Sequence, residues 1–262
     1  MNTAGTNQPL IRAVAWGGAA MFAVSFLYFV FSYAVTFGEI LPGSPRLGAI
    51  VWNVMLFTGF ALHHSVFARE RVRAAVARIV PPQLERSVYV WVASLLFIGV
   101  CAAWARVPSA IWRLDGPVTW LLYAVQIFGI WLTLRSAAVI DVWELSGVRQ
   151  VSTPNAQRLT MDQLPNVHDH ALGVGSAKRV GRWEFKTDGP YGWVRHPIYL
   201  GWFLTLFAAS TMTMTRFVFA VVSCAYLVIA IPYEERSLRI ASGGVYDEYV
   251  AKVRWKLIPY VY

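Results

Sequence analysis

Two polar clusters near the C-terminus hold the residue types that chemistry requires. The first is Arg195-His196, with Tyr199 three residues beyond the histidine, and the second is Glu234-Glu235. The apolar stretch between them carries one charge, Arg216. The first cluster offers cationic and hydrogen-bonding groups to a carboxylate, and the second offers carboxylates to a cation. Together they predict a site for a charged small molecule, such as one with an amino acid moiety.

Helix geometry explains how the first cluster would be positioned. Pro197 favours the first turn of a helix, so Arg195 and His196 would lie at a helix N-terminus, which attracts anions. His196 and Tyr199 would share one helix face because they are three residues apart. The alternatives are an interfacial membrane anchor for Arg195-His196 and, for the glutamate pair, a solvated helix end paired with Arg236 or Arg239.

The elements that position these clusters are predicted to cross a membrane. Hydrophobic residues make up 57% of the 262-residue chain and charged residues 14%, a composition typical of an all-α integral membrane protein. Six charge-poor segments can be marked off: Ala13–Phe37, Leu47–Ala68, Val88–Ala105, Pro117–Leu134, Pro197–Ser210 and Phe217–Tyr233. The fifth is short for a full span, so we expect five to six transmembrane helices, the last two forming a tight hairpin.

The basic residues predict the orientation of these helices. With six crossings and a cytoplasmic N-terminus, the outer loops carry Arg46, Arg106, Arg113 and Arg216, while most of the other basic residues lie inside. This bias predicts cytoplasmic N- and C-termini, with both polar clusters on the inner side of a bacterial inner membrane. The net charge of +9 then reflects orientation and attraction to anionic lipid. The pattern shows no sign of nucleic-acid binding.

The chain is expected to form a single membrane domain, 1–262. Residues 1–140 would form a four-span bundle, 141–196 a cytoplasmic loop, and 197–262 the hairpin and a tail. Within the loop, 152–175 is expected to be irregular and 182–191 to begin with a short extended piece. In the tail, Tyr246, Tyr249, Val250 and Val253 have helical spacing among charges, which predicts an amphipathic helix on the inner membrane surface.

The remaining polar and thiol-bearing residues give weaker signals. His63-His64 lies at the inner end of the second span, near Arg69, and a substrate-facing or interfacial role is favoured over a metal site, which would need further ligands. Cys101 and Cys224 fall mid-span in different segments and read as small apolar core residues. We expect no metal.

The clusters also resemble a known family. The run Arg195-His196-Pro197-Ile198-Tyr199-Leu200-Gly201, followed by an apolar hairpin and Glu234-Glu235, is similar to the signature of the isoprenylcysteine carboxyl methyltransferase and phospholipid methyltransferase superfamily of integral membrane enzymes. Leu62–Arg69, Pro82–Tyr89 and Trp143–Gln150 resemble its bacterial methanethiol S-methyltransferase branch.

This resemblance implies that S-adenosyl-L-methionine binds on the cytoplasmic side and that an acceptor enters from the bilayer. By position, the cofactor would be contacted by Phe185, Lys186, Tyr191, His196, Pro197, Ile198, Tyr199, Gly201 and Glu235. Arg195, His196 and Glu234 would be catalytic, and His63, His64 and Arg69 would meet the substrate.

The acceptor implied by the resemblance is a small or lipophilic thiol such as methanethiol. Phospholipid N-methylation and prenylcysteine carboxyl O-methylation are the alternatives among enzymes. The prenylcysteine enzymes carry an arginine four residues before the first glutamate, where this chain has Ala230. Outside the enzymes, the alternative is a non-catalytic accessory or transport protein on the same scaffold. The oligomeric state is left open.

Overall fold

The structure is a computed structural model that describes residues 8–67, 72, 75–76, 78–140, 142–152, 176–179, 182–185, 187 and 189–262. The longer helices are α1 (Gln8–Ala34), α2 (Leu47–Phe67), α4 (Glu85–Ala103), α5 (Pro117–Ile140), α8 (Pro197–Phe207), α9 (Met214–Ser242) and α10 (Val245–Lys252). The short elements are η1 (Thr36–Gly38), η2 (Pro82–Leu84), β1 (Ala110–Arg113), α6 (Val142–Leu145), α7 (Arg149–Ser152), β2 (Ser176–Arg179), β3 (Arg182–Phe185), η4 (Gly189–Gly192) and β4 (Thr211–Thr213).

Five helices are long and apolar enough to cross a membrane, namely α1, α2, α4, α5 and α9. Their outward faces carry large apolar side chains, including Leu47 and Trp120, each 75% exposed in the isolated chain. An outer surface of this kind belongs in lipid, and the prediction of an all-α integral membrane protein is confirmed. The sixth apolar helix, α8, has 11 residues. It rises about 16 Å, roughly half the hydrocarbon thickness.

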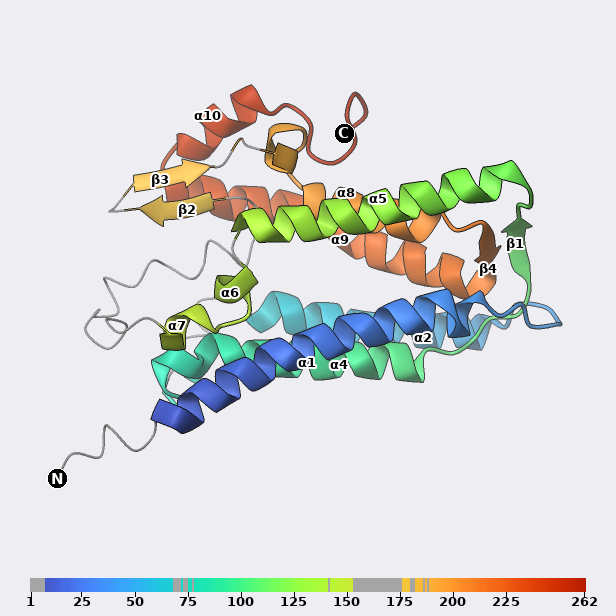
Figure 1. Cartoon of the computed structure of the whole chain (residues 1–262), viewed down its shortest axis with the longest axis horizontal. Coiled ribbons are helices and arrows are strands. Elements are labelled where there is room, and N and C mark those ends of the chain that lie inside the picture. Colours follow the sequence, from blue (N-terminus) through green and yellow to red (C-terminus); the bar gives the residue numbers. More distant parts are fainter. Residues whose placement is uncertain are drawn as a thin grey trace.

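The helices form two groups (Figure 1). Helix α4 packs against both α1 and α2, whereas α5 packs along α8. Helix α9 contacts both α2 and α8 and so connects the groups. Aromatic residues fill the junction, where the Phe29 ring stacks on Trp202 of α8 and Phe219 of α9 at centroid distances of 4.7 and 5.5 Å. The fourth predicted span therefore finds its main partner in the short helix α8.

Small residues let α5 and α8 approach closely. A Cβ atom added to Gly201 would lie 2.6 Å from the carbonyl oxygen of Gly129, and one added to Gly129 would lie 2.7 Å from that of Gly201. One turn further along each helix stand Thr133 and Thr205, so both helices present a small residue every four positions. This pattern is typical of tight helix packing in membranes. Through it, α5 fixes the position and tilt of α8.

The two ends of the bundle carry different elements (Figure 1). At one end, β1 pairs antiparallel with β4 and closes the turn between α8 and α9. At the other end, β2 pairs antiparallel with β3, and α10 packs on β3. The extended piece predicted to begin at Arg182 is β3, while its partner β2 was not predicted. Most of the predicted irregular loop, 153–175, lies outside the described residues.

The C-terminal region differs from the prediction in two ways. Helix α9 does not end at the glutamate pair but continues to Ser242. Pro232 lies inside this helix and does not end it. The apolar face of α10 was expected on the membrane surface. Instead, Tyr246 and Tyr249 are buried against Phe185 of β3 and Leu238 of α9. The helix is amphipathic as predicted, but protein covers its apolar side.

Candidate active site

The turn before α8 places the first cluster. Gly189 in η4 has a φ of +58°, and a Cβ on Gly192 would lie 2.3 Å from the carbonyl oxygen of Thr187, so glycine suits both positions of this tight turn. The C-terminal segment then pairs with the chain after the turn. The N–H groups of Arg195 and His196 donate to the carbonyl oxygens of Trp255 and Lys256 at 2.9 and 2.8 Å. The two key residues are thereby held before the helix begins.

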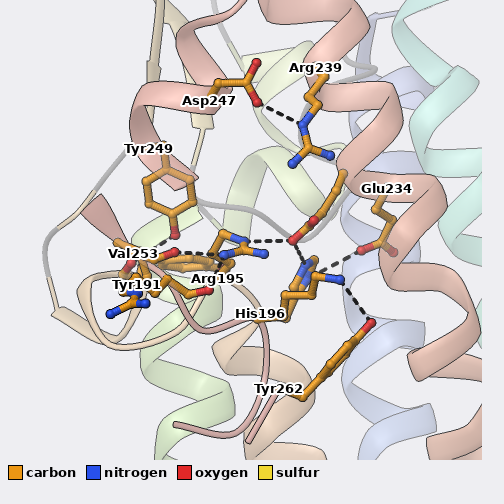
Figure 2. A network of polar contacts seen from close by, with 12 residues as sticks. Tyr191, Arg195, His196, Glu234, Arg239, Asp247, Tyr249, Val253 and Tyr262 are labelled. Atoms are coloured by element: carbon orange, nitrogen blue, oxygen red, sulfur yellow. Dashed lines mark hydrogen bonds and ion pairs between the residues drawn. The ribbon is translucent and has the colours of Figure 1, made fainter. Parts of the chain in front are cut away.

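Arg195 binds the chain itself. Its side chain is 3% exposed, and its Nε donates to Glu235 Oε1 at 2.7 Å. Its Nη1 donates to the carbonyl oxygens of Val253 and Arg254 at 2.9 and 2.6 Å. Figure 2 shows the guanidinium lying between the glutamate of α9 and the C-terminal segment. Arg195 therefore joins the start of α8, helix α9 and the tail.

His196 lies between the two glutamates. It occupies the N-cap position of α8, is 1% exposed, and stacks its ring on Tyr199 at a centroid distance of 5.3 Å. Its Nδ1 is 3.6 Å from Glu234 Oε2, and its Nε2 is 3.4 Å from Glu235 Oε1 (Figure 2). The Tyr199 hydroxyl donates to Glu234 Oε1. The prediction that His196 and Tyr199 share a face is confirmed.

Several polar atoms at this site lack hydrogen-bond partners. They are both ring nitrogens of His196, Oε2 of Glu234 and the hydroxyl of Tyr246, and all of them are buried. The ring nitrogens lie within ion-pair range of the carboxylates but make no hydrogen bond with them. An unmade hydrogen bond on a buried polar atom costs about 1–3 kcal/mol. Such a cluster is expected where a ligand supplies the missing partners.

Burial also sets the protonation state of the site. Desolvation lowers the pKa of His196 below its usual 6.5, and the nearby Glu235 only partly offsets this effect. The imidazole is therefore neutral at pH 7, with one nitrogen able to donate and the other to accept. Burial raises the pKa of Tyr191, whose phenol stays protonated. The fixed charges nearest His196 are those of the Arg195–Glu235 pair.

The structure brings together most of the residues predicted for the site. Tyr191, Arg195, His196, Tyr199, Glu234 and Glu235 converge at the start of α8, and Pro197 and Ile198 form its first turn. Gly201 instead faces Gly129 of α5, where it allows close helix packing. Phe185 is buried against Tyr246 and Tyr249. Lys186 lies outside the described residues.

The predicted substrate residues lie on a different helix. His63 and His64 are near the C-terminal end of α2, beside Tyr89 of α4. Arg69 lies outside the described residues. The alternative pairing of the glutamates with Arg239 is wrong, because the Arg239 Nε donates to Asp247 at 2.9 Å. Among the residues that the structure describes, no group of three or more His, Cys, Asp or Glu side chains could hold a metal ion.

Sequence reasoning missed the tail residues that complete the site. The Tyr249 hydroxyl donates to the carbonyl oxygen of Tyr191 at 2.9 Å, and the buried Tyr246 hydroxyl has no hydrogen-bond partner. Lys256 is near enough to His196 to influence its charge, and its Nζ donates to the Tyr262 hydroxyl at 3.3 Å. The spacing of Tyr246 and Tyr249 had been read only as a membrane-facing stripe. Two tyrosine hydroxyls on one face could instead have indicated a polar site beneath α10.

Comparisons with known proteins show which family the chain belongs to. The sequence profile of the isoprenylcysteine carboxyl methyltransferase family matches residues 159–240. The chain is 33% identical over 239 residues to methanethiol S-methyltransferase 2 of Bradyrhizobium diazoefficiens, covering 89% of this chain and 84% of the relative. It is 34% identical over 250 residues to methanethiol S-methyltransferase of Crocosphaera subtropica, covering 90% of each. The chain belongs to the isoprenylcysteine carboxyl methyltransferase family.

The chain is therefore a membrane methyltransferase. A further relative, methanethiol S-methyltransferase of Mycobacterium tuberculosis, is 31% identical over 243 residues, which cover 88% of this chain and 91% of the relative. No solved structure matches the chain significantly. The family profile includes both polar clusters and the hairpin between them, and it ends before Tyr246 and Tyr249. The tail side of the site thus lies beyond the matched residues.

Proposed function

We propose that this chain transfers a methyl group from S-adenosyl-L-methionine to a small thiol such as methanethiol. The observation that carries the proposal is the set of buried, unpartnered polar atoms on His196 and Glu234 at the start of α8. The family is one of methyltransferases, and the relatives named above are methanethiol S-methyltransferases. The methyl donor and the acceptor are our assignments for this chain.

The residues at the site fit the methyl donor. S-Adenosyl-L-methionine supplies a methyl group bonded to a positively charged sulfur, and it carries an ammonium and a carboxylate group. Glu234 Oε2 is a buried carboxyl oxygen without a hydrogen-bond partner, and a cationic group beside it would favour the ionised carboxylate and donate to it. The neutral His196 can donate one hydrogen bond, and the N-terminus of α8 favours an anion. Phe185, Lys186, Tyr191, Ile198 and Tyr199 would line the remainder of the cofactor site.

We assign one residue of the first cluster a role other than the predicted one. Arg195 was predicted as catalytic, but three of its contacts are to Glu235 and the tail, so we assign it the positioning of His196. Glu235 neutralises Arg195 and supports the same residue. His196 and Glu234 remain the groups that we propose meet the reacting molecules. Gly201 acts through helix packing.

Methyl transfer to a thiol needs alignment and exclusion of water more than it needs a strong acid or base. The attacking sulfur must approach in line with the bond that breaks, which a rigid site enforces. The negative thiolate and the positive sulfonium neutralise each other as the new bond forms. Water would stabilise these separated charges and so slow the reaction, which is why a dry site favours it. The near-complete burial of His196 and Glu235 provides such a site.

The acceptor follows from the relatives and from one residue. Ala230 stands where prenylcysteine enzymes place an arginine for the substrate carboxylate, and this absence favours an acceptor without a carboxylate. We propose that the acceptor enters from the bilayer. We also propose a bacterial inner membrane location with cytoplasmic termini, which puts the donor site on the side where basic residues gather.

The test uses the full chain in lipid nanodiscs with methyl-labelled S-adenosyl-L-methionine and methanethiol. We expect label in volatile dimethyl sulfide and a loss of this product in His196→Ala. Label that appears only in extracted lipid would identify a phospholipid methyltransferase and contradict the thiol assignment. Failure to bind the donor, together with indifference to His196→Ala, would contradict the proposed enzyme site.

A further inference from the structure

A second polar cluster lies at the inner end of α2 and the start of α4. The Nδ1 of His64 is 2.5 Å from the Tyr89 hydroxyl, and the His63 ring is parallel to that of Tyr89, with 6.1 Å between centroids and 10° between planes. Arg86 places its guanidinium 5.2 Å from the Tyr89 ring centroid. Two histidines and a tyrosine therefore form one contact group within apolar, membrane-spanning helices.

His63 is the unsatisfied member of this group. Both of its ring nitrogens are buried and make no hydrogen bond, while its ring packs on Phe67 at 4.3 Å. A polar side chain in a membrane span is costly to keep, and two unmade hydrogen bonds add to that cost. Packing alone would be served by leucine at this position. A ligand with a proton to give would satisfy the ring.

The cluster lies next to the proposed methyl-donor site. Tyr89 is close enough to Tyr199 of α8 to interact with it electrostatically. Tyr199 in turn donates a hydrogen bond to Glu234. This electrostatic coupling between Tyr89 and Tyr199 links the group of His63, His64 and Tyr89 to the group of Tyr199, Glu234 and His196. The donor site thus has a polar neighbour on the side of α2 and α4.

We propose that His63 accepts the proton of the acceptor thiol and that Tyr89 and His64 position it. The proposal rests on the proposed thiol methylation and assigns its acceptor side. The thiol proton passes to a ring nitrogen of His63. The sulfur lone pair forms the new bond to the methyl carbon, and the electrons of the broken carbon–sulfur bond stay on the departing sulfur. His63 then releases its proton to water, which restores the neutral ring.

The assignment to His63 rather than His64 follows from their contacts. Nδ1 of His64 is engaged by Tyr89, whereas neither ring nitrogen of His63 has a hydrogen-bond partner, so its unprotonated nitrogen can accept a proton. Among the residues that the structure describes, the charged or titratable groups that face this cluster are Arg86 and Tyr89 on α4 and, through Tyr199, Glu234 on α9. A thiol needs this help because even cysteine, with a pKa of about 8.5, is only a few per cent ionised at pH 7, and a simple alkanethiol is a weaker acid.

The test is the pH profile of His63→Asn in nanodiscs, with His63→Gln as a second variant. Asparagine keeps a polar side chain but cannot accept a proton near neutral pH. Because methanethiol is a weaker acid than cysteine, whose pKa is about 8.5, we expect kcat/KM for methanethiol to fall at least about 30-fold at pH 7. The loss should shrink about tenfold per pH unit as the pH rises towards the thiol pKa. The affinity for S-adenosyl-L-methionine, measured by titration, should not change.

Thr58→Val is the matched control on the same helix. Thr58 Oγ1 lies 2.5 Å from the Tyr226 hydroxyl of α9, so its loss disturbs α2 packing without touching the histidines. The control should keep the wild-type pH profile. Tyr89→Phe tests the positioning role and should mainly raise KM for methanethiol. A His63 variant that matches wild type, or one with an equal deficit at every pH, would overturn the proposal. If wild type itself neither binds the donor nor makes dimethyl sulfide, the proposed function fails instead.

Discussion

At the end of the bundle that carries β1 and β4, buried polar side chains are paired, whereas at the end that carries β2, β3 and α10 several are not. At the first end, Arg216 donates to the carbonyl oxygens of Tyr33, Ala34 and Thr211 at 2.6–2.9 Å. Asn53 bonds both the N–H and the carbonyl oxygen of Ala105 at 2.8 Å. Among the described buried side chains there, Trp104 is an exception, because its Nε1 has no partner.

At the other end, His196, Glu234 and Tyr246 keep unpartnered atoms although donors and acceptors surround them. Because the buried polar groups at the first end are hydrogen-bonded, the unpartnered atoms at the second end are not a general property of this fold. The difference indicates that the first end is built for stability and the second for a ligand. Substitutions at the two ends should therefore separate folding from binding.

The largest expected effect on stability is at the Arg195–Glu235 ion pair. Arg195→Met should destabilise the protein by about 3–5 kcal/mol, because it leaves the Glu235 charge buried without its partner. The thermal unfolding temperature of the purified protein in detergent measures this. The double variant R195M/E235L should recover part of the loss. If the double variant is no more stable than the single one, the ion pair is not what holds the tail to α8 and α9.

A smaller effect, on stability but not on donor binding, is expected at the end of the bundle that carries β1 and β4. Arg216→Met removes a charged side chain that donates three hydrogen bonds, two of them to the last carbonyl groups of α1. We expect this to destabilise the protein by about 2–3 kcal/mol. The affinity for S-adenosyl-L-methionine should stay at the wild-type value when measured below the unfolding transition. Weaker donor binding in this variant would mean that the two ends are coupled, which contradicts the separation.

The smallest effect concerns pH. Burial lowers the pKa of His196, so the unfolded chain binds a proton more readily than the folded one. Stability from this residue is present above pH 6.5 and falls as the pH drops below it, by at most about 1.4 kcal/mol per unit. Unfolding temperatures of wild type and His196→Asn between pH 7.5 and 5 test this, since the variant should lose less. A wild type that gains stability relative to the variant at low pH would mean that a protonated His196 bridges the glutamates.

The sequence predicted the membrane architecture and the main site because both depend on local patterns. Five of the six predicted apolar segments became long helices, and Pro197 began α8 as expected. His196 and Tyr199 stacked because helix periodicity requires it. The position of the glutamates beside His196 also followed from a hairpin that returns to the membrane side where it began.

What could not be predicted depends on contacts between distant segments. Nothing in the order of the spans indicates that α5 packs along α8 through Gly129 and Gly201. Arg195 donates hydrogen bonds to the tail because the residues after α10 pass beside it, and helical periodicity does not predict the path of those residues. Tyr246 and Tyr249 matched a membrane-facing stripe equally well, and only the position of β3 decided otherwise.

The central claim is that the inner site is kept unsatisfied for a cationic ligand, and Glu234→Gln tests it most directly. The variant keeps the shape of the side chain but replaces the carboxyl, whose Oε2 has no partner, by an amide that cannot become a carboxylate beside a cation. Calorimetric titration of S-adenosyl-L-methionine in nanodiscs should show about 10- to 100-fold weaker binding, at an unfolding temperature equal to or above that of wild type. Unchanged affinity with a lower unfolding temperature would show that Glu234 serves the fold, and it would contradict the account.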